Sequence, residues 1–231
     1  MLSKRSLVIA IDGPAGSGKS TTARLVAERM GLLHIDTGAM YRAITLKVLE
    51  HGVSPNDVDS VASLMDSTRI ELRRGNSTLQ VYLDGRDVTD RIRDADVTRA
   101  VSAVSRIRRI REAMVKQQRA LGRSQGVVLE GRDIGTVVFP DADLKVFLVA
   151  SLEARALRRK TELEAKGIEV SIEDLRNEIA ERDRLDSTRE ESPLKRSSDA
   201  IELDTSNLTI ENQVEFVVMK ANEILKKSTE K

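Results

Sequence analysis

The feature that most restricts the fold lies near the start of the chain, where a short apolar run leads directly into a glycine-rich motif. Leu7-Val8-Ile9-Ala10-Ile11 predicts a buried strand, and Gly13-Pro14-Ala15-Gly16-Ser17-Gly18-Lys19-Ser20 fits the pattern G-x-x-x-x-G-K-[ST] ahead of a helical segment. Such a loop turns its backbone N–H groups around an anion, and the backbone angles that this requires favour glycine. The stretch therefore predicts a phosphate-binding loop between the first strand and the first helix.

The loop also predicts how a nucleotide triphosphate would be held. Lys19 supplies a point charge for the β- and γ-phosphates, the Ser20 hydroxyl can ligate Mg²⁺, and the helix directs the positive end of its dipole at the phosphates. We expect ATP with Mg²⁺, the metal at Ser20, and ATP contacts from Gly13, Pro14, Ala15, Gly16, Ser17, Gly18, Lys19, Ser20 and Thr21.

Composition excludes several other classes of protein. The chain has no cysteine, so it can form neither a disulfide nor a thiolate metal site, which fits a reducing cytoplasm. The first apolar run is too short for a signal peptide, and no other stretch could span a membrane. Proteins that bind single-stranded nucleic acid use excess positive charge and aromatic side chains on which the bases stack. This chain has a net charge of +1 and only 2% aromatic residues, which argues against that function. We therefore expect a cytoplasmic protein without a membrane or nucleic-acid partner.

The elements that follow alternate in the way typical of a doubly wound α/β fold with a parallel sheet. The pattern predicts strands over 6–12, 32–36, 126–130, 143–150 and 201–204, and helices over 19–30, 39–50, 96–123, 151–166, from 171 onward, and 210–227. Ligands bind beyond the carboxyl ends of parallel strands, so Asp36-Thr37, Arg132-Asp133 and the phosphate loop should face one crevice.

A period-two pattern interrupts this alternation. Residues 68–73 and 79–83 alternate between apolar and polar side chains, and Gly75-Asn76 between them supplies a turn. This predicts a small antiparallel insert over 63–96, within a core formed by 1–62 and 97–231. The insert could be decoration, but an insert of this size in an α/β enzyme more often closes over a substrate.

The acceptor of the phosphoryl group has to come from the rest of the chain. The sequence contains no N-K-x-D motif, which argues against a GTPase switch, and no apolar strand that ends in Asp-Glu, which argues against a motor ATPase. Glu130 ends a strand but precedes Gly131-Arg132, which leaves a structural role and a role near Mg²⁺ equally open. Arginines are abundant near strand ends and helix starts, and phosphoryl transfer between two phosphates needs cationic clamps.

Four motifs together resemble bacterial cytidylate kinase. They are the phosphate loop, Asp36-Thr37-Gly38-Ala39-Met40-Tyr41-Arg42, Gly131-Arg132-Asp133-Ile134-Gly135-Thr136-Val137-Val138-Phe139-Pro140, and Arg182-Asp183 with Asp186 and Arg189. The resemblance covers nearly the whole chain. It implies a phosphate-loop kinase core, an enlarged domain that binds the nucleoside monophosphate, a short lid near 155–170, and phosphorylation of CMP and dCMP to CDP and dCDP.

The resemblance also implies site residues. Asp133, which can accept a hydrogen bond from the N4 amino group of cytosine, would discriminate against uracil. Arg42 matches a ligand of the acceptor phosphate, Arg182 and Asp186 match residues at the ribose, and Arg189 bridges toward the transferred phosphate. The expected substrate-binding residues are Thr37, Arg42, Ser102, Arg111, Arg132, Asp133, Arg182, Asp186 and Arg189, and the expected catalytic residues are Lys19, Arg132, Arg155, Arg158, Arg182 and Arg189.

Two points in this assignment depend on local structure. Ser102 and Arg111 would lie on opposite faces of one unbroken helix, so both can line a site only if the helix breaks between residues 105 and 109. Among the lid arginines Arg155, Arg158 and Arg159, at least one is expected to face solvent. We expect structural roles for His34 and His51.

Two other functions remain open from the residues alone. The chain could be a kinase for another small acceptor, such as UMP, AMP or a metabolite hydroxyl. It could also be an RNA-binding protein that uses the arginine-rich helix near 106–111 and is regulated by ATP. The leading expectation is a monomeric enzyme whose partners are ATP, CMP and dCMP.

Overall fold

The computed structural model describes residues 7–74, 79–122, 125–165 and 167–229. The chain divides into two compact units. The first unit contains the chain up to His34 together with the chain from Gly122 onward, and the second contains Ile35–Leu121.

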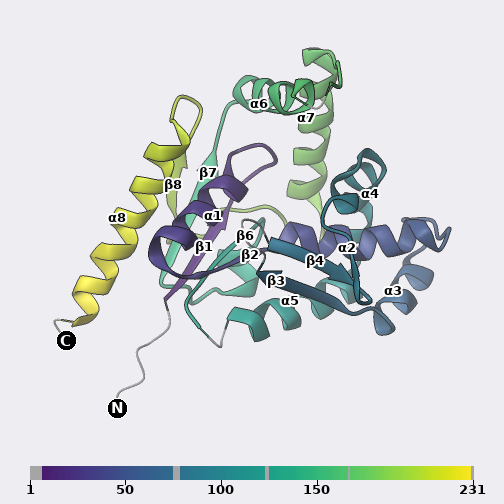
Figure 1. Ribbon diagram of the computed structural model, residues 1–231, viewed down its shortest axis with the longest axis horizontal. Coiled ribbons are helices and arrows are strands. Elements are labelled where there is room, and N and C mark those ends of the chain that lie inside the picture. Colours follow the sequence, from purple (N-terminus) through teal and green to yellow (C-terminus); the bar gives the residue numbers. More distant parts are fainter. Residues whose placement is uncertain (1–6, 75–78, 123–124, 166, 230–231) are drawn as a thin grey trace. The chain divides into compact units, whose positions relative to one another are not determined.

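The first unit is built on a sheet with the strand order β2-β6-β1-β7-β8 (Figure 1). The strands are β1 Val8–Asp12, β2 Leu33–Asp36, β6 Val127–Gly131, β7 Leu144–Val149 and β8 Ile201–Asp204. β1 pairs in parallel with β6 on one side and with β7 on the other, and β8 extends the sheet in parallel beside β7. The prediction of a doubly wound parallel sheet is confirmed. β1 is the central strand, and the strand order reverses beside it. The phosphate loop, which follows β1, therefore lies at the point of the sheet where ligands bind in folds of this kind.

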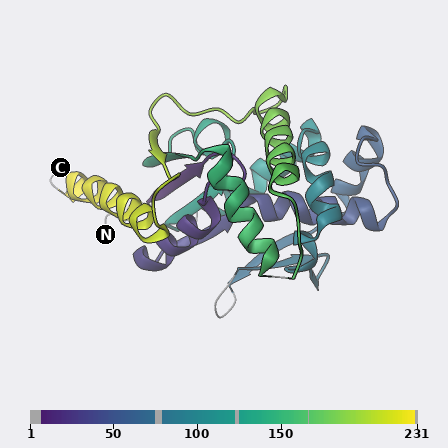
Figure 2. The ribbon, with the colours of Figure 1, turned by 90° about the horizontal axis from the view of Figure 1, so that it is seen from above.

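Helices α1 Lys19–Met30 and α8 Ile210–Thr229 pack side by side against this sheet (Figures 1 and 2). α1 ends at Gly31, whose φ of 64° is in the left-handed region that closes helices. Ala23 and Val26 of α1 are fully buried with Val214 and Val217 of α8. This core fixes the first turn of α1 relative to the strand that precedes the loop.

Two helices that follow the sheet form a small cluster of their own, α6 Leu152–Glu164 and α7 Ile172–Thr188. Ser151 caps α6 by accepting a hydrogen bond from the Ala154 N–H, and Ser171 caps α7 by accepting from the N–H groups of Glu173 and Asp174. Ala156, Leu175 and Ile179 form the apolar contact between the two helices. The first unit also contains η2 Ile134–Val138, a short π-helical turn after β6 that the sequence pattern did not predict.

The second unit contains the predicted antiparallel strands. β3 Ile70–Arg74 pairs with β4 Leu79–Leu83, and β4 pairs in turn with β5 Arg86–Asp87. The predicted turn at Gly75-Asn76 lies outside the described residues. The helical elements of this unit are α2 Thr37–Glu50, α3 Val58–Asp66, η1 Arg91–Arg93, α4 Ala95–Ser105 and α5 Arg108–Gly122.

One expected helix is divided in the structure. The segment predicted as one helix over 96–123 forms α4 and α5, which are separated at Arg106 and Ile107. At this break Arg111 Nη1 of α5 donates to the Ser105 carbonyl at 3.1 Å, which satisfies one of the end groups of α4. The break lies within the interval that Ser102 and Arg111 require if both are to line a site.

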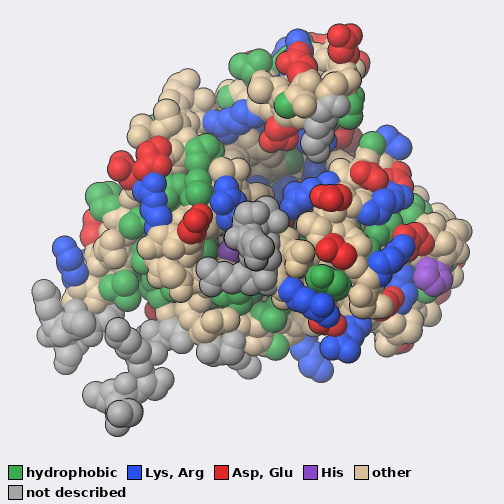
Figure 3. Space-filling model, viewed as in Figure 1, with side chains coloured by type: hydrophobic (Ala, Val, Ile, Leu, Met, Phe, Trp, Pro, Cys, Tyr) green, Lys and Arg blue, Asp and Glu red, His purple; other side chains and the backbone are tan. Residues whose placement is uncertain are grey.

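The surface carries mixed charge. Lysine and arginine side chains alternate with aspartate and glutamate over the face that Figure 3 shows, without a large area of one sign. This distribution agrees with the net charge of +1. Among the residues that the structure describes, no helix is both long and apolar enough to cross a membrane.

Candidate active site

The phosphate loop joins β1 to α1, and its conformation explains its glycines. Gly13 has a φ of 148° and Gly18 a φ of 95°, both in the region that side chains rarely adopt. A Cβ on Gly13 would also lie 2.2 Å from the Leu148 backbone oxygen of β7. The loop residues from Gly13 to Gly18 therefore follow a path that only glycine permits at these two positions, and Lys19, Ser20 and Thr21 form the first turn of α1.

The Lys19 amine lies back over the loop. Its Nζ donates to the Pro14 carbonyl oxygen at 2.6 Å and lies 3.4 Å from Ser17 Oγ. Burial and, next, the nearby Arg132 guanidinium lower the pKa of Lys19 to about 7, although Glu130 opposes this change. Burial thus makes the charged form of Lys19 costly, and the nearby carboxylates offset only part of that cost.

Ser20 and Glu130 meet beside the loop. Ser20 Oγ donates to Glu130 Oε2 at 2.6 Å, and the other carboxylate oxygen, Oε1, lies 3.2 Å from His34 Nε2. Burial raises the pKa of Glu130, but the hydrogen bond from His34, together with Lys19 and Ser20, lowers it below its ordinary value. Glu130 is therefore an ionised carboxylate at neutral pH, next to the hydroxyl that the sequence assigned to Mg²⁺.

Asp12 is a buried carboxylate that the sequence reasoning did not single out. It ends β1, and its two oxygens accept hydrogen bonds from the N–H groups of Ile134 at 2.9 Å and Gly135 at 2.8 Å. Burial raises the pKa of Asp12 to about 6 against the effect of these two bonds, and Asp133 raises it further. Asp12 holds the start of η2 against β1, and a charged residue at the end of an apolar strand was the signal that could have identified it.

Two of the three lid arginines contact the phosphate loop. Arg155 Nη1 donates to the Ala15 carbonyl at 3.2 Å, and Arg158 Nη1 donates to the Gly16 carbonyl at 3.3 Å. Arg158 also donates to the carbonyl of Thr205, whose hydroxyl donates to the Ser17 carbonyl at 2.9 Å. Arg159 instead pairs with Glu162 on the exposed face of α6, at 3.1 Å. Arg155 and Arg158 thus lie at the loop, and Arg159 is the arginine that faces solvent.

A second group of charged residues joins the end of β6 to α7. Arg132 Nε donates to Asp186 Oδ2 at 2.8 Å, and both side chains are largely buried. Arg189 Nη2 lies 3.8 Å from Asp133 Oδ1, and both of these side chains are 6% exposed. Burial, followed by Arg132, lowers the pKa of Arg182, and within the described residues its buried Nε has no hydrogen-bond partner. Residues 50 positions apart in the sequence therefore form one cluster of guanidinium and carboxylate groups.

The acceptor residues predicted in the second unit gather around α2 and α4. Arg42 Nη1 donates to Thr98 Oγ1 of α4 at 2.8 Å, and Ser102 lies one helical turn further along α4. The Arg111 guanidinium lies over the Tyr41 ring, 5.4 Å from its centre. Thr37 is buried in the first turn of α2, next to Asp36, which caps the helix by accepting from the Ala39 N–H.

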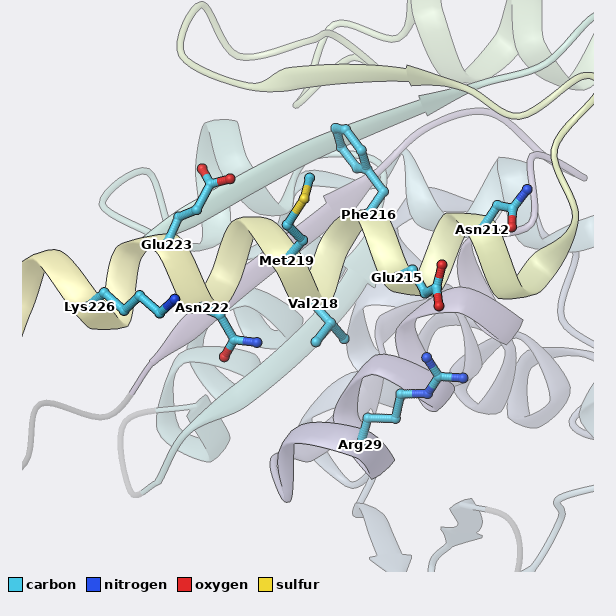
Figure 4. A pocket seen from close by; sticks show the side chains of 9 residues that line it. All are labelled: Arg29, Asn212, Glu215, Phe216, Val218, Met219, Asn222, Glu223 and Lys226. Atoms are coloured by element: carbon cyan, nitrogen blue, oxygen red, sulfur yellow. The ribbon is translucent and has the colours of Figure 1, made fainter.

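A surface groove lies outside these groups. It runs along α8 and includes Arg29 of α1, as Figure 4 shows. Arg29 already pairs with Glu211 at 2.5 Å, and none of the predicted site residues lines the groove. In the described part of the chain, no group of three or more histidine or acidic side chains could hold a metal ion.

Comparison with known proteins agrees with these features. The family model described as cytidylate kinase matches residues 9–223. A cytidylate kinase from Bacillus pumilus is 49% identical over 223 residues, which cover 96% of this chain and 99% of the relative. A cytidylate kinase from Geobacillus kaustophilus is 50% identical over 220 residues, which cover 95% and 98% of the two chains.

Among solved structures, an uncharacterised protein from Eubacterium ventriosum matches with a TM-score of 0.50 and 14% identity, over 94% of this chain and 98% of the other. At this identity the likeness concerns the fold alone. The family match spans both units and includes every predicted site residue. The chain therefore belongs to the cytidylate kinase family and is a nucleoside monophosphate kinase.

Proposed function

We propose that this chain transfers the γ-phosphoryl group of ATP to CMP and dCMP and produces ADP with CDP or dCDP. The observation that best supports this proposal is the cluster at the end of β6, where Arg132, Arg182 and Arg189 accompany Asp133 and Asp186 in one unit with the phosphate loop. Three guanidinium groups with two carboxylates suit a ligand that carries a phosphate, a ribose and a base with a hydrogen-bond donor.

Mg²⁺ fits the oxygen ligands beside the loop. Ser20 Oγ is a hard oxygen ligand, and the ionised Glu130, which accepts a hydrogen bond from the Ser20 hydroxyl, adds negative charge beside it. Ser20 would hold the ion, and Glu130 would hold Ser20. When bound, the ion supplies charge neutralisation at the β- and γ-phosphates. Lys19, whose lowered pKa reflects an unneutralised buried amine, would regain its positive charge beside the same phosphates.

The acceptor phosphate needs no general base in this reaction. A phosphate monoester has its second pKa near 6, so at neutral pH an acceptor oxygen is already deprotonated. That oxygen attacks the γ-phosphorus, the bond from phosphorus to the bridging oxygen of ADP breaks, and the bridging oxygen keeps the electron pair. The task of the protein is to hold two anions in line, and Arg42, Arg132 and Arg189 are the residues that we assign to this task.

Asp133 is the residue that we assign to base recognition. A buried carboxylate can accept a hydrogen bond from the N4 amino group of cytosine, whereas uracil presents a carbonyl oxygen at that position. The Asp133 side chain is 6% exposed, so a uracil carbonyl would place a second hydrogen-bond acceptor against a buried carboxylate, and the two acceptors would repel each other. The proposal therefore includes rejection of UMP.

Several broader parts of the proposal concern the whole chain. We assign the antiparallel insert over 63–96 to the nucleoside monophosphate domain, within a core of 1–62 and 97–231, and the segment 155–170 to a short lid. The proposed enzyme acts as a monomer in the cytoplasm, without nucleic acid or a membrane.

An acceptor panel tests the substrate. Release of ADP from Mg·ATP is measured with CMP, dCMP, UMP, AMP, shikimate and RNA in parallel. The proposal predicts turnover with CMP and dCMP that exceeds turnover with UMP at least tenfold. Equal rates for CMP and UMP would contradict the proposed preference for cytosine over uracil. Turnover only with a hydroxyl acceptor would contradict the proposed transfer to a phosphate group.

The Asp133→Asn variant tests the assignment of the base contact. A loss of a buried charged hydrogen bond of about 2 to 3 kcal/mol lowers kcat/KM for CMP by roughly 30- to 150-fold, while UMP turnover changes little. Asp141→Asn, which changes an exposed carboxylate in the turn after η2, is the matched control and should leave both rates unchanged. An unchanged ratio of CMP to UMP turnover in Asp133→Asn contradicts this role.

A further inference from the structure

Glu130 is held on both sides, and one of its two partners is a histidine. His34 belongs to β2, and its side chain is 15% exposed. Its Nε2 lies 3.2 Å from Glu130 Oε1, and since a carboxylate only accepts, Nε2 is the donor. On the other side Glu130 Oε2 accepts a hydrogen bond from Ser20 Oγ, at 2.6 Å between the two oxygens. Two hydrogen bonds thus connect three side chains: His34 of β2, Glu130 near the end of β6, and Ser20 in the first turn of α1.

The orientation of Glu130 is not fixed by its backbone. A glutamate side chain has three rotatable bonds, so its carboxylate needs partners to keep one position. The carboxylate is 4% exposed, and His34 and Ser20 are two such partners, one on each of its oxygens. If the hydrogen bond from His34 were lost, Oε1 would lose that donor and the carboxylate would be held less firmly in the position that faces Ser20.

The position of Glu130 decides where the Ser20 hydroxyl points its proton. When Oε2 accepts the hydrogen bond from the Ser20 hydroxyl, the lone pairs of Ser20 Oγ face away from Glu130 and can coordinate a cation. When the carboxylate turns, the hydroxyl proton is free to point toward the cation. Partners that orient a metal ligand in this way commonly change metal affinity by about 10- to 100-fold when they are removed.

We propose that His34 is a positioning residue for the metal-nucleotide site, which acts by holding Glu130 against the Ser20 hydroxyl. The inference rests on the proposed function, because it takes Ser20 as the ligand of Mg²⁺ bound with ATP. It assigns no contact between His34 and either ligand. It also replaces the purely structural role that the sequence suggested for this histidine.

Binding of ATP with and without Mg²⁺ tests the inference separately from catalysis. By isothermal titration calorimetry, His34→Leu should reduce the gain in ATP affinity that Mg²⁺ produces by about tenfold, while ATP affinity in EDTA stays within about twofold. His34→Gln, which keeps an N–H donor of similar reach, should recover most of the gain. In steady-state kinetics, His34→Leu should raise KM for Mg·ATP and leave KM for CMP unchanged.

The chain offers a matched control, since it contains only one other histidine. His51 Nδ1 lies 2.8 Å from the Lys47 carbonyl oxygen at the end of α2, and His51→Leu should leave the Mg²⁺ effect unchanged. If His34→Leu does not fold, imidazole ¹⁵N spectra of the unaltered protein give the answer. Mg·ATP should shift the His34 Nε2 signal more than ATP in EDTA does.

The outcomes separate the inference from the function on which it rests. If the unaltered chain phosphorylates CMP and His34→Leu still shows the full Mg²⁺ effect, the role of His34 is wrong and the proposed function stands. If the His34 signal responds equally to ATP with and without Mg²⁺, the role is wrong as well. If Mg²⁺ gives the unaltered chain no gain in ATP affinity, the role of His34 fails together with the assignment of Mg²⁺ to Ser20, whereas the transfer to CMP is still decided by the acceptor panel.

Discussion

Lys19 should make the protein less stable while it makes the enzyme active. In the folded chain the pKa of Lys19 falls from its ordinary 10.5 to about 7, chiefly through burial. Between these two pH values the unfolded chain holds one more proton than the folded chain, so the free energy of unfolding rises with pH by about 1.4 kcal/mol per pH unit. At pH 7 and below, the accumulated cost is about 5 kcal/mol.

Lys19→Met should therefore stabilise the nucleotide-free protein at pH 7. Methionine avoids the charge but gives up the bond from Nζ to the Pro14 carbonyl and the contact with Ser17, together about 1 to 3 kcal/mol. A net gain of roughly 2 to 4 kcal/mol remains, or about 4 to 15 °C in Tm for a chain of this size. The gain should shrink as pH rises and change sign before pH 10.5, because the remaining cost of losing the lysine proton on folding then falls below the value of the contacts that methionine gives up. Turnover should be lost at every pH.

Urea unfolding at pH 7, 8 and 9 without nucleotide measures this effect. Lys145→Met is the control, because Lys145 is also buried but has a carboxylate partner, Asp199 Oδ2, at 2.8 Å from Nζ. That variant should be less stable at pH 7, since it removes the ion pair with Asp199 and leaves the Pro140 carbonyl without its lysine donor. The reasoning is refuted if Lys19→Met is less stable than the unaltered chain at pH 7, or if the difference between the two does not vary with pH.

Two further pairs of variants test the geometry around the loop. Arg158→Ala should lower kcat by at least tenfold, because Arg158 donates to the Gly16 carbonyl of the loop. Arg159→Ala, on the exposed face of α6, should leave kcat within twofold. Similar losses of kcat in the two variants would contradict the different roles assigned to these arginines. Gly13→Ala should destabilise the fold by more than about 3 kcal/mol or prevent folding, because its Cβ would meet the Leu148 oxygen. Gly31→Ala, at a position with positive φ but no atom within 4 Å of the added Cβ, should lower the free energy of unfolding by only about 1 kcal/mol in the same assay. Equal losses in the two variants would show that backbone strain, and not the contact with Leu148, determines the loss at Gly13.

Local patterns were sufficient to predict the elements around the loop. The predicted helix over 19–30 and the predicted strand over 201–204 agree with α1 and β8 to the residue. Both have a strong apolar periodicity or a clear boundary, such as Gly31 after α1. α3 was missed although its signals were present, since Asp57 caps it by accepting from the Ser60 N–H, and Val61 and Met65 form its buried face.

Features that depend on distant residues could not be predicted in this way. The break between α4 and α5 has no proline or glycine to mark it, and the hydrogen bond that accompanies it runs from Arg111 of one helix to the Ser105 carbonyl of the other. The pair of Ser20 and Glu130 joins positions 110 residues apart, and the contact between Arg158 and Thr205 joins positions 47 apart. The sequence motifs could predict which residues carry the chemistry, but the pairing of these side chains follows from tertiary packing.

The most direct test of the proposed reaction is a ³¹P NMR time course of the unaltered protein with equal amounts of ATP and CMP in the presence of Mg²⁺. The account predicts that the β-phosphate signal of CDP grows in step with ADP, one molecule for each ATP consumed, with no release of inorganic phosphate. ADP that accumulates with inorganic phosphate in place of CDP would mean that water is the acceptor, and it would contradict the account.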